Sequence, residues 1–136
     1  MTQRFLITSG IMGVTTVILG AAGSHVLEGN ISAHHLSQFN SGLIFQMFNT
    51  VVLLAITFMN RYVVRSFLNA IYFLFVIGTA LFSIPLYLFS ITELTGDIFG
   101  FLSAAPPIGA LLMIAGWITL FLAGLSYKHK KRSSKS

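Results

Sequence analysis

The sequence predicts an all-α membrane protein, in which four antiparallel transmembrane helices form an up-down-up-down bundle. Three observations predict this fold. Only 8% of the 136 residues are charged, against roughly 25% in an ordinary soluble domain, whereas 55% are hydrophobic and the mean hydropathy is +0.86. Four stretches are apolar over the ~20 residues that cross a hydrocarbon core. The basic and acidic residues occupy different connections between these stretches. Eleven charges are too few to cover a soluble surface, and the hydrophobicity excludes intrinsic disorder.

The four predicted spans run approximately over residues 5–27, 42–59, 67–92 and 106–127. None of them has Asp, Glu, Lys or Arg in its interior. They form a single domain, residues 1–127, which a basic tail, residues 128–136, follows. The first span has an alternative interpretation as a cleaved secretory signal, because a basic residue precedes it and small residues end it. Its apolar run is longer than the ~7–15 residues of a signal core, which favours a membrane span.

Local signals refine three of these elements. Ser32 is an N-cap candidate, so the second helix is expected to begin near His34, ahead of its span. Pro85 predicts a kink in the third helix and a freed carbonyl at Leu81, which the Ser83 hydroxyl or a neighbouring helix could satisfy. The apolar residues 98–105 are too few to span and are expected at the interface, and two prolines, residues 106–107, begin the fourth helix.

The charged residues predict the orientation. Every basic residue lies before the first span, between the second and third, or after the fourth; these topology anchors include Arg4, Arg61, Arg65, Lys128, Lys130, Lys131 and Arg132. The other two connections hold all three acidic residues, Glu28, Glu93 and Asp97. The positive-inside rule therefore predicts a multi-pass protein of the cell (inner) membrane with both termini in the cytoplasm. The basic tail is expected to touch anionic lipid headgroups and not nucleic acid.

Each span carries a stripe of small or polar residues at helical spacing, which predicts close helix packing because lipid is as apolar as leucine. The glycines expected at helix contacts are Gly13, Gly20, Gly23, Gly42, Gly109 and Gly116. Candidate functional or packing positions are His25, Gln46, Asn49, Ser83, Tyr87 and Trp117. An unpaired amide in hydrocarbon costs several kcal/mol, so Gln46 and Asn49 are expected to point into the bundle. The indole N–H of Trp117 is expected to find a polar stripe residue or a carbonyl.

These segments resemble a family of small bacterial inner-membrane proteins of unknown function, the YgdD-like family, which has a eukaryotic relative. The resemblance is carried by residues 20–25 (GAAGSH), 45–49 (FQMFN), 81–87 (LFSIPLY), 107–110 (PIGA) and 115–117 (AGW). It implies four spans in an inner membrane and supplies no activity. Asn49 stands where the family has an intramembrane histidine, and Phe45 stands where it has a tyrosine.

The sequence favours a non-enzymatic membrane protein that needs no cofactor or metal and binds a lipid or a partner, with the bilayer itself as its first partner. A second copy of the chain or another membrane protein remains an alternative partner. A small oligomeric transporter or channel is the alternative function, although the spans lack the charges that ion-coupled transport uses. A membrane enzyme or metal-binding protein would have to use the histidines of the acidic side: His25, His34 and His35.

Overall fold

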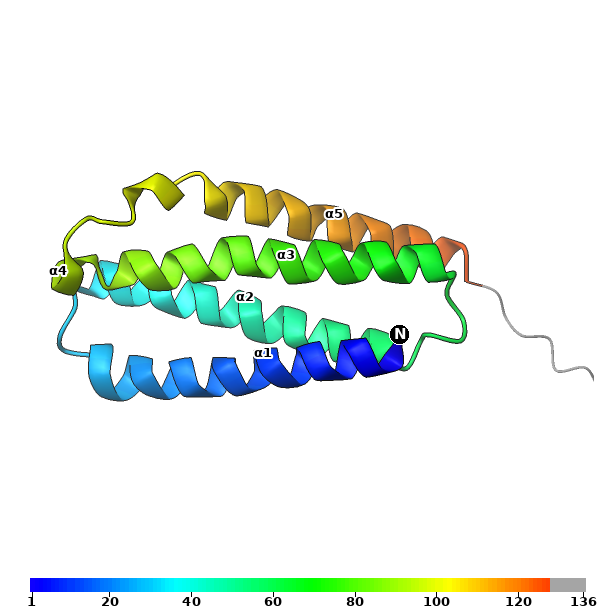
Figure 1. Cartoon of the computed structure of the whole chain (residues 1–136), viewed down its shortest axis with the longest axis horizontal. Helices are drawn as coiled ribbons and strands as arrows, with labels where there is room; N and C mark the ends of the chain where they lie inside the picture. Colours follow the sequence, from blue (N-terminus) through cyan, green and yellow to red (C-terminus); the bar gives the residue numbers. More distant parts are fainter. Residues whose placement is uncertain (128–136) are drawn as a thin grey trace, which may run out of the picture.

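The computed structural model describes residues 1–127 and shows only helices and their connections in that range (Figure 1). The long helices are α1 (Thr2–Ala22), α2 (Ala33–Thr57), α3 (Arg65–Ser90) and α5 (Ala105–Leu125). Three short elements join them: η1 (Gly23–Leu27), α4 (Thr92–Thr95) and η2 (Gly100–Leu102). η1 is a π-helical turn that extends α1.

Four helical segments of 25 or 26 residues are long and apolar enough to cross a membrane, which confirms the predicted fold class. The observed helix bounds lie close to the predicted ones. The second helix begins at Ala33, one residue before the expected start at His34 and ahead of the predicted span 42–59. Ser32 caps this helix, since its hydroxyl accepts the backbone N–H of His35 at 3.3 Å. Of the predicted interfacial segment 98–105, residues 100–102 form a single turn, η2.

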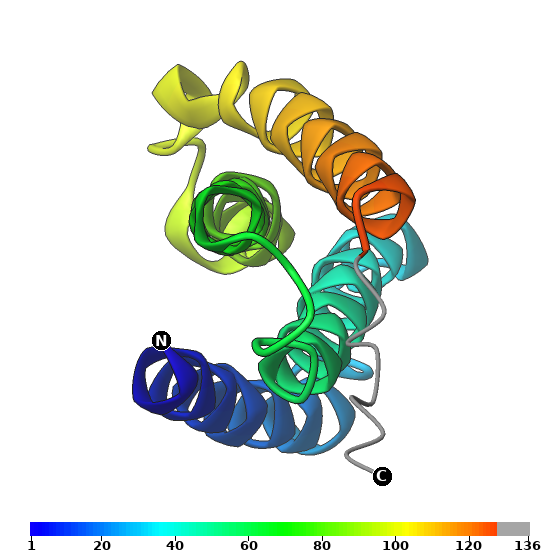
Figure 2. The same ribbon diagram turned by 90° about the vertical axis from the view of Figure 1, so that its right-hand side faces the viewer.

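Each long helix packs against its neighbour in sequence. The extensive interfaces are α1–α2, α2–α3 and α3–α5. Viewed along the bundle, α3 lies beside both α2 and α5, while α1 and α5 lie on opposite sides (Figure 2). One apolar cluster runs through these interfaces and contains Phe5, Leu53, Ile56, Leu68, Ile71, Phe75 and Ala123.

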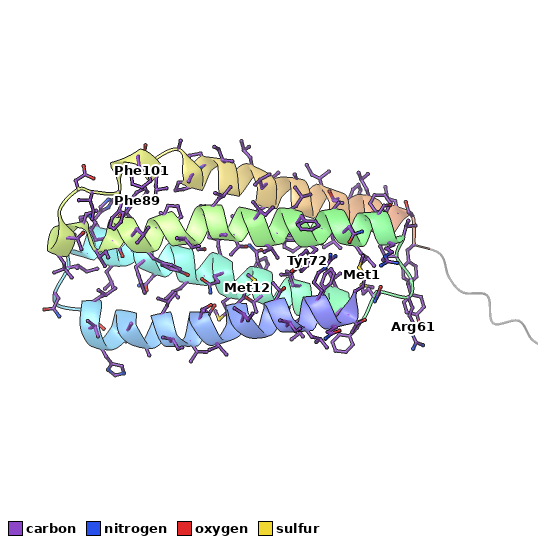
Figure 3. The ribbon with its side chains drawn as sticks, in the orientation of Figure 1. Met1, Met12, Arg61, Tyr72, Phe89 and Phe101 are labelled. Atoms are coloured by element: carbon purple, nitrogen blue, oxygen red, sulfur yellow. The ribbon has the colours of Figure 1, made fainter. Side chains whose placement is uncertain are left out.

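The connections divide the charges between the two ends of the bundle. The connections that carry Glu28 and Glu93 lie at one end, and the N-terminus lies at the other end, with the α2–α3 connection that carries Arg61 (Figures 1 and 3). Arg65 begins α3 at that same end. The tail anchors Lys128, Lys130, Lys131 and Arg132 lie outside the described residues.

Helix α3 continues without interruption through the buried Pro85. Of the two groups expected to satisfy the carbonyl of Leu81, the Ser83 hydroxyl donates elsewhere, to the carbonyl of Gly42 on α2, at 2.8 Å. Gly109 of the neighbouring helix α5 packs closely against the α3 backbone at Leu81. The predicted kink at Pro85 stays a prediction.

Candidate functional site

Gln46 joins three helices from the middle of α2. Its side chain is only 7% exposed. The amide nitrogen donates to the carbonyl of Met12, at 3.1 Å, and to the hydroxyl of Thr15, at 2.8 Å, both on α1. The amide oxygen accepts the hydroxyl of Tyr87 on α3, at 2.6 Å. Gln46 and Tyr87 thus satisfy one another inside the span, and the amide pays no penalty for an unpaired polar group.

A cleft lies between α1 and α3, and Gln46 of α2 forms part of its floor. Its volume is about 290 Å³. It is lined by Met12, Thr15, Leu19, Gln46, Val76, Thr79, Ala80, Ser83, Ile84 and Tyr87, and most of the exposed lining is apolar. Figure 3 shows the side of the bundle where α1 and α3 lie in front of α2. Met12 lies there at the edge of α1 that faces the other helices. The site is therefore a lipid-depth cavity with polar groups that are already paired.

Asn49 makes its hydrogen bonds on another side of α2 than Gln46 does. It is 1% exposed, and its amide nitrogen donates to the Thr79 hydroxyl, at 2.8 Å, and to the Met113 sulfur, at 2.9 Å. A second cavity, of about 310 Å³, lies between α2 and α5; Asn49 and Trp117 are among the residues that line it. Gln46 and Asn49, three residues apart, therefore face different clefts.

Trp117 makes ring contacts and not the expected polar one. Its ring centroid lies 5.7 Å from that of Phe48 and 5.4 Å from that of Phe75. The side chain is 40% exposed, and within residues 1–127 its indole N–H has no hydrogen-bond partner. The expected hydrogen bond to a stripe residue or a carbonyl is therefore wrong for the described part of the chain.

The glycines differ in how tightly they are packed. A Cβ at Gly109 would lie 2.6 Å from the Gly78 carbonyl oxygen, and one at Gly42 would lie 2.8 Å from the Tyr87 ring. A Cβ at Gly23 would meet Phe39 at 2.7 Å, one at Gly116 would meet Phe75 at 3.3 Å, and one at Gly13 would meet Thr50 at 3.9 Å. At Gly20 the same position has nothing within 4 Å, so the expected contact there is absent from the described structure.

A second set of interacting polar residues lies at the end of the bundle that carries Glu28 and Glu93. The carboxylate of Glu93 accepts the backbone N–H of Ser32, at 3.1 Å to each oxygen, and the Nδ1–H of His35. These contacts tie the start of α2 to α4. His25 is exposed on η1, and in the described part of the chain no three His, Asp or Glu side chains are grouped as metal ligands would be.

The Glu93 contact predicts a pH-dependent contribution to stability. Hydrogen bonds from Ser32, aided by His35, lower the pKa of the Glu93 carboxyl from its ordinary value of 4.5. A lowered pKa in the folded state stabilises the fold above that ordinary value, and the contribution is lost as the pH falls through the lowered pKa. E93Q should therefore lower the melting temperature in detergent near neutral pH. This difference should shrink as the pH falls below about 4.5.

The matched control is E28Q, which removes an exposed carboxylate at the same end. Its melting temperature should follow that of the unmodified chain at every pH. An E93Q difference that persists unchanged down to about pH 3 would contradict the assignment.

The sequence did not single out Met12 and Thr15. Met12 contributes a backbone carbonyl, which no residue pattern reveals. Thr15 is exposed and stands beside the predicted stripe of α1, which runs through Gly13 and Gly20. The one available signal is the spacing of Met12, Thr15 and Leu19, which places them on one helix face.

Comparisons with known proteins agree with this architecture. A family model described as "Protein of unknown function (DUF423)" matches residues 19–110. The "UPF0382 inner membrane protein YgdD" of Escherichia coli K12 is 31% identical over 133 residues, 96% of each chain. The "UPF0382 membrane protein YwdK" of Bacillus subtilis is 30% identical over 125 residues, 90% of this chain and 97% of the relative. No solved structure matches. The chain therefore belongs to the DUF423 family of membrane proteins of unknown function.

Proposed function

We propose that this membrane protein is a non-enzymatic lipid-binding accessory of the cell membrane, which holds a hydrocarbon chain in the α1–α3 cleft. The cleft itself is the observation that carries the proposal. It opens at the depth of the spans, and its exposed lining is largely apolar. Ligand sites in membrane and soluble bundles lie in such spaces between helices, with apolar walls and few polar groups.

The size of the cleft suits part of a lipid tail. A methylene group is about as large as a water molecule, which takes up ~30 Å³ in the liquid, so about 290 Å³ holds roughly ten such groups. Membrane helices associate through van der Waals packing, so an empty space beside α1 would forfeit contacts that a chain restores. The paired state of Gln46, Thr15 and Tyr87 favours binding over catalysis, because these groups are hydrogen-bonded to one another.

A phospholipid with a photoreactive diazirine in its acyl chain tests the proposal on the full chain in nanodiscs. We expect crosslinks to concentrate on Leu19, Val76 and Ile84, which line the cleft. A80W should fill the cleft and abolish these crosslinks, with A80L as a milder variant. A21W adds the same indole at an exposed position of α1 outside the cleft and should leave them unchanged. Even labelling of every lipid-facing residue, unaltered by A80W, would refute the proposal.

The same proposal includes the orientation, with both termini in the cytoplasm. It is supported by Arg4, Arg61 and Arg65 at one end of the bundle and the acidic side chains in the connections at the other end. The chain has no cysteine, so single cysteines report accessibility directly. An impermeant maleimide should label E28C on intact cells, and Q3C only after permeabilisation. The reverse labelling pattern would show that both termini lie outside the cytoplasm.

A further inference from the structure

We propose that the lipid in the cleft is an anionic phospholipid, whose phosphate the guanidinium group of Arg4 holds at the N-terminal end of the cleft. This inference rests on the proposed function and adds the class of headgroup. Four features carry it: a further cavity in line with the cleft, the depth of the cleft, the unbalanced charge of Arg4 and a spare hydroxyl donor.

A further cavity, distinct from the one between α2 and α5, lies on the same α1–α3 face as the cleft. Its volume is about 430 Å³, and it is lined by Met1, Gln3, Arg4, Ile7, Thr8 and Tyr72. On α1 it ends at Thr8, one helical turn from Met12 of the cleft, and on α3 Tyr72 lies one turn from Val76. Figure 3 shows Met1, Tyr72 and Met12 in order along the space between the two helices. We call the cavity at Arg4 the headgroup cavity.

The distances along α1 match one leaflet. At 1.5 Å per residue, Met12 and Thr15 lie ~12–17 Å from Arg4 along the helix axis. Half of a ~30 Å hydrocarbon core is ~15 Å deep. A phospholipid with its phosphate at Arg4 would therefore reach the cleft with the distal part of an acyl chain.

Arg4 has no counter-charge in the described structure. Its Nη2 donates to Oδ1 of Asn69, at 2.7 Å, and its guanidinium lies 4.3 Å from the centroid of the Tyr72 ring. Both partners are neutral, and Nε is shielded from solvent without a hydrogen-bond partner. The chain's three acidic side chains belong to the connections at the far end of the bundle. An anion from outside the protein is the natural partner for such a guanidinium.

The headgroup cavity also offers a hydroxyl donor. The hydroxyls of Thr8 and Tyr72 lie 2.6 Å apart and share one hydrogen bond. Two hydroxyl groups carry two donor hydrogens, so one remains for an acceptor in the cavity. A phosphate oxygen accepts from both the guanidinium and this hydroxyl. A zwitterionic headgroup would bring an ammonium group to an end of the bundle where no side-chain carboxylate can pair with it.

Native mass spectrometry of the full chain, released from nanodiscs of equal phosphatidylglycerol and phosphatidylcholine, tests the headgroup. We expect the unmodified chain to retain phosphatidylglycerol preferentially. R4Q should reduce that preference at least about fivefold, in line with the loss of one basic contact near anionic lipid. R4K keeps the charge without the planar fork and should fall between them. R61Q removes an exposed cation from the same end, outside the headgroup cavity, and should change nothing.

Other outcomes overturn the inference. Equal losses in R4Q and R61Q would mean general attraction to an anionic surface. Retention of added oleate in place of phosphatidylglycerol would assign the site to a free carboxylate. Cleft crosslinks that persist without any headgroup preference would refute the phosphate and leave the proposed function standing, whereas missing crosslinks would refute the proposed function itself. Melting temperatures of R4Q and R4K separate lost binding from lost folding.

Discussion

Alanine at Gly109 is expected to push α5 away from α3 and to destabilise the folded bundle by about 1–3 kcal/mol, the usual cost of overpacking. The added Cβ would lie 2.6 Å from the carbonyl oxygen of Gly78 and 2.6 Å from the backbone nitrogen of Phe82. Both obstacles are backbone atoms, so no side-chain rotation relieves the contact. The two helices must separate, and membrane helices depend on close packing for their association.

The matched control is G124A on the same helix, where a Cβ would meet nothing within 4 Å. G124A should leave stability unchanged or raise it slightly, since alanine is the better helix former. Unfolding of the purified variants by a denaturing detergent, titrated into mild micelles, measures the difference. If G109A and G124A unfold at the same detergent concentration, α5 does not pack closely on α3 at Gly109.

Removal of the Phe75 ring is the second large expected effect. Phe75 is fully buried, its ring contacts Trp117, and it lies so near Gly116 that a Cβ there would be 3.3 Å from the ring. In a bilayer the unfolded reference is also apolar, so the transfer part of the usual cost disappears. The cavity part remains: ~100 Å³ of lost ring volume, at ~24 cal/mol per Å³, gives about 2 kcal/mol for F75A.

The expected result for F75A is an earlier unfolding transition together with altered Trp117 fluorescence. Trp117 is the only tryptophan, so its emission reports this contact directly. F121A removes a ring that is 65% exposed on α5 and should leave both readouts close to those of the unmodified chain. Unchanged emission in F75A would show that the two rings do not pack as described.

The spans could be predicted because their determinants are linear. Length, hydropathy and the sorting of charges are read along the chain, and the four helices follow them closely. Helix packing depends in addition on which faces meet. The small-residue stripes marked both Gly109 and Gly20, yet Gly109 meets the α3 backbone and Gly20 meets nothing. A glycine in the sequence indicates that another helix could pack closely at that position. It does not indicate which helix does so.

The polar residues show the same contrast between burial, which the sequence predicts, and packing partners, which it does not. The cost of a bare amide in hydrocarbon correctly predicts that Gln46 and Asn49 are buried. It does not show that they face separate clefts, because that depends on where α1 and α5 sit around α2 and α3. The partners of Gln46 were hidden for a simpler reason, since one of them is the backbone carbonyl of Met12.

The pairing of each long helix with its sequence neighbour has a consequence for biogenesis. Every extensive interface joins two long helices that follow one another in the chain, so the entropy lost in closing each connection is small. The α1–α2 hairpin can therefore assemble before α5 has left the ribosome, and α5 is added last onto a surface that already exists. We expect a chain that ends after Asn60 and has been released from the ribosome to insert as a packed hairpin, which a crosslink between cysteines placed at Gly13 and Thr50 would detect. If no such crosslink forms, α1 and α2 pack together only after the later helices have been added.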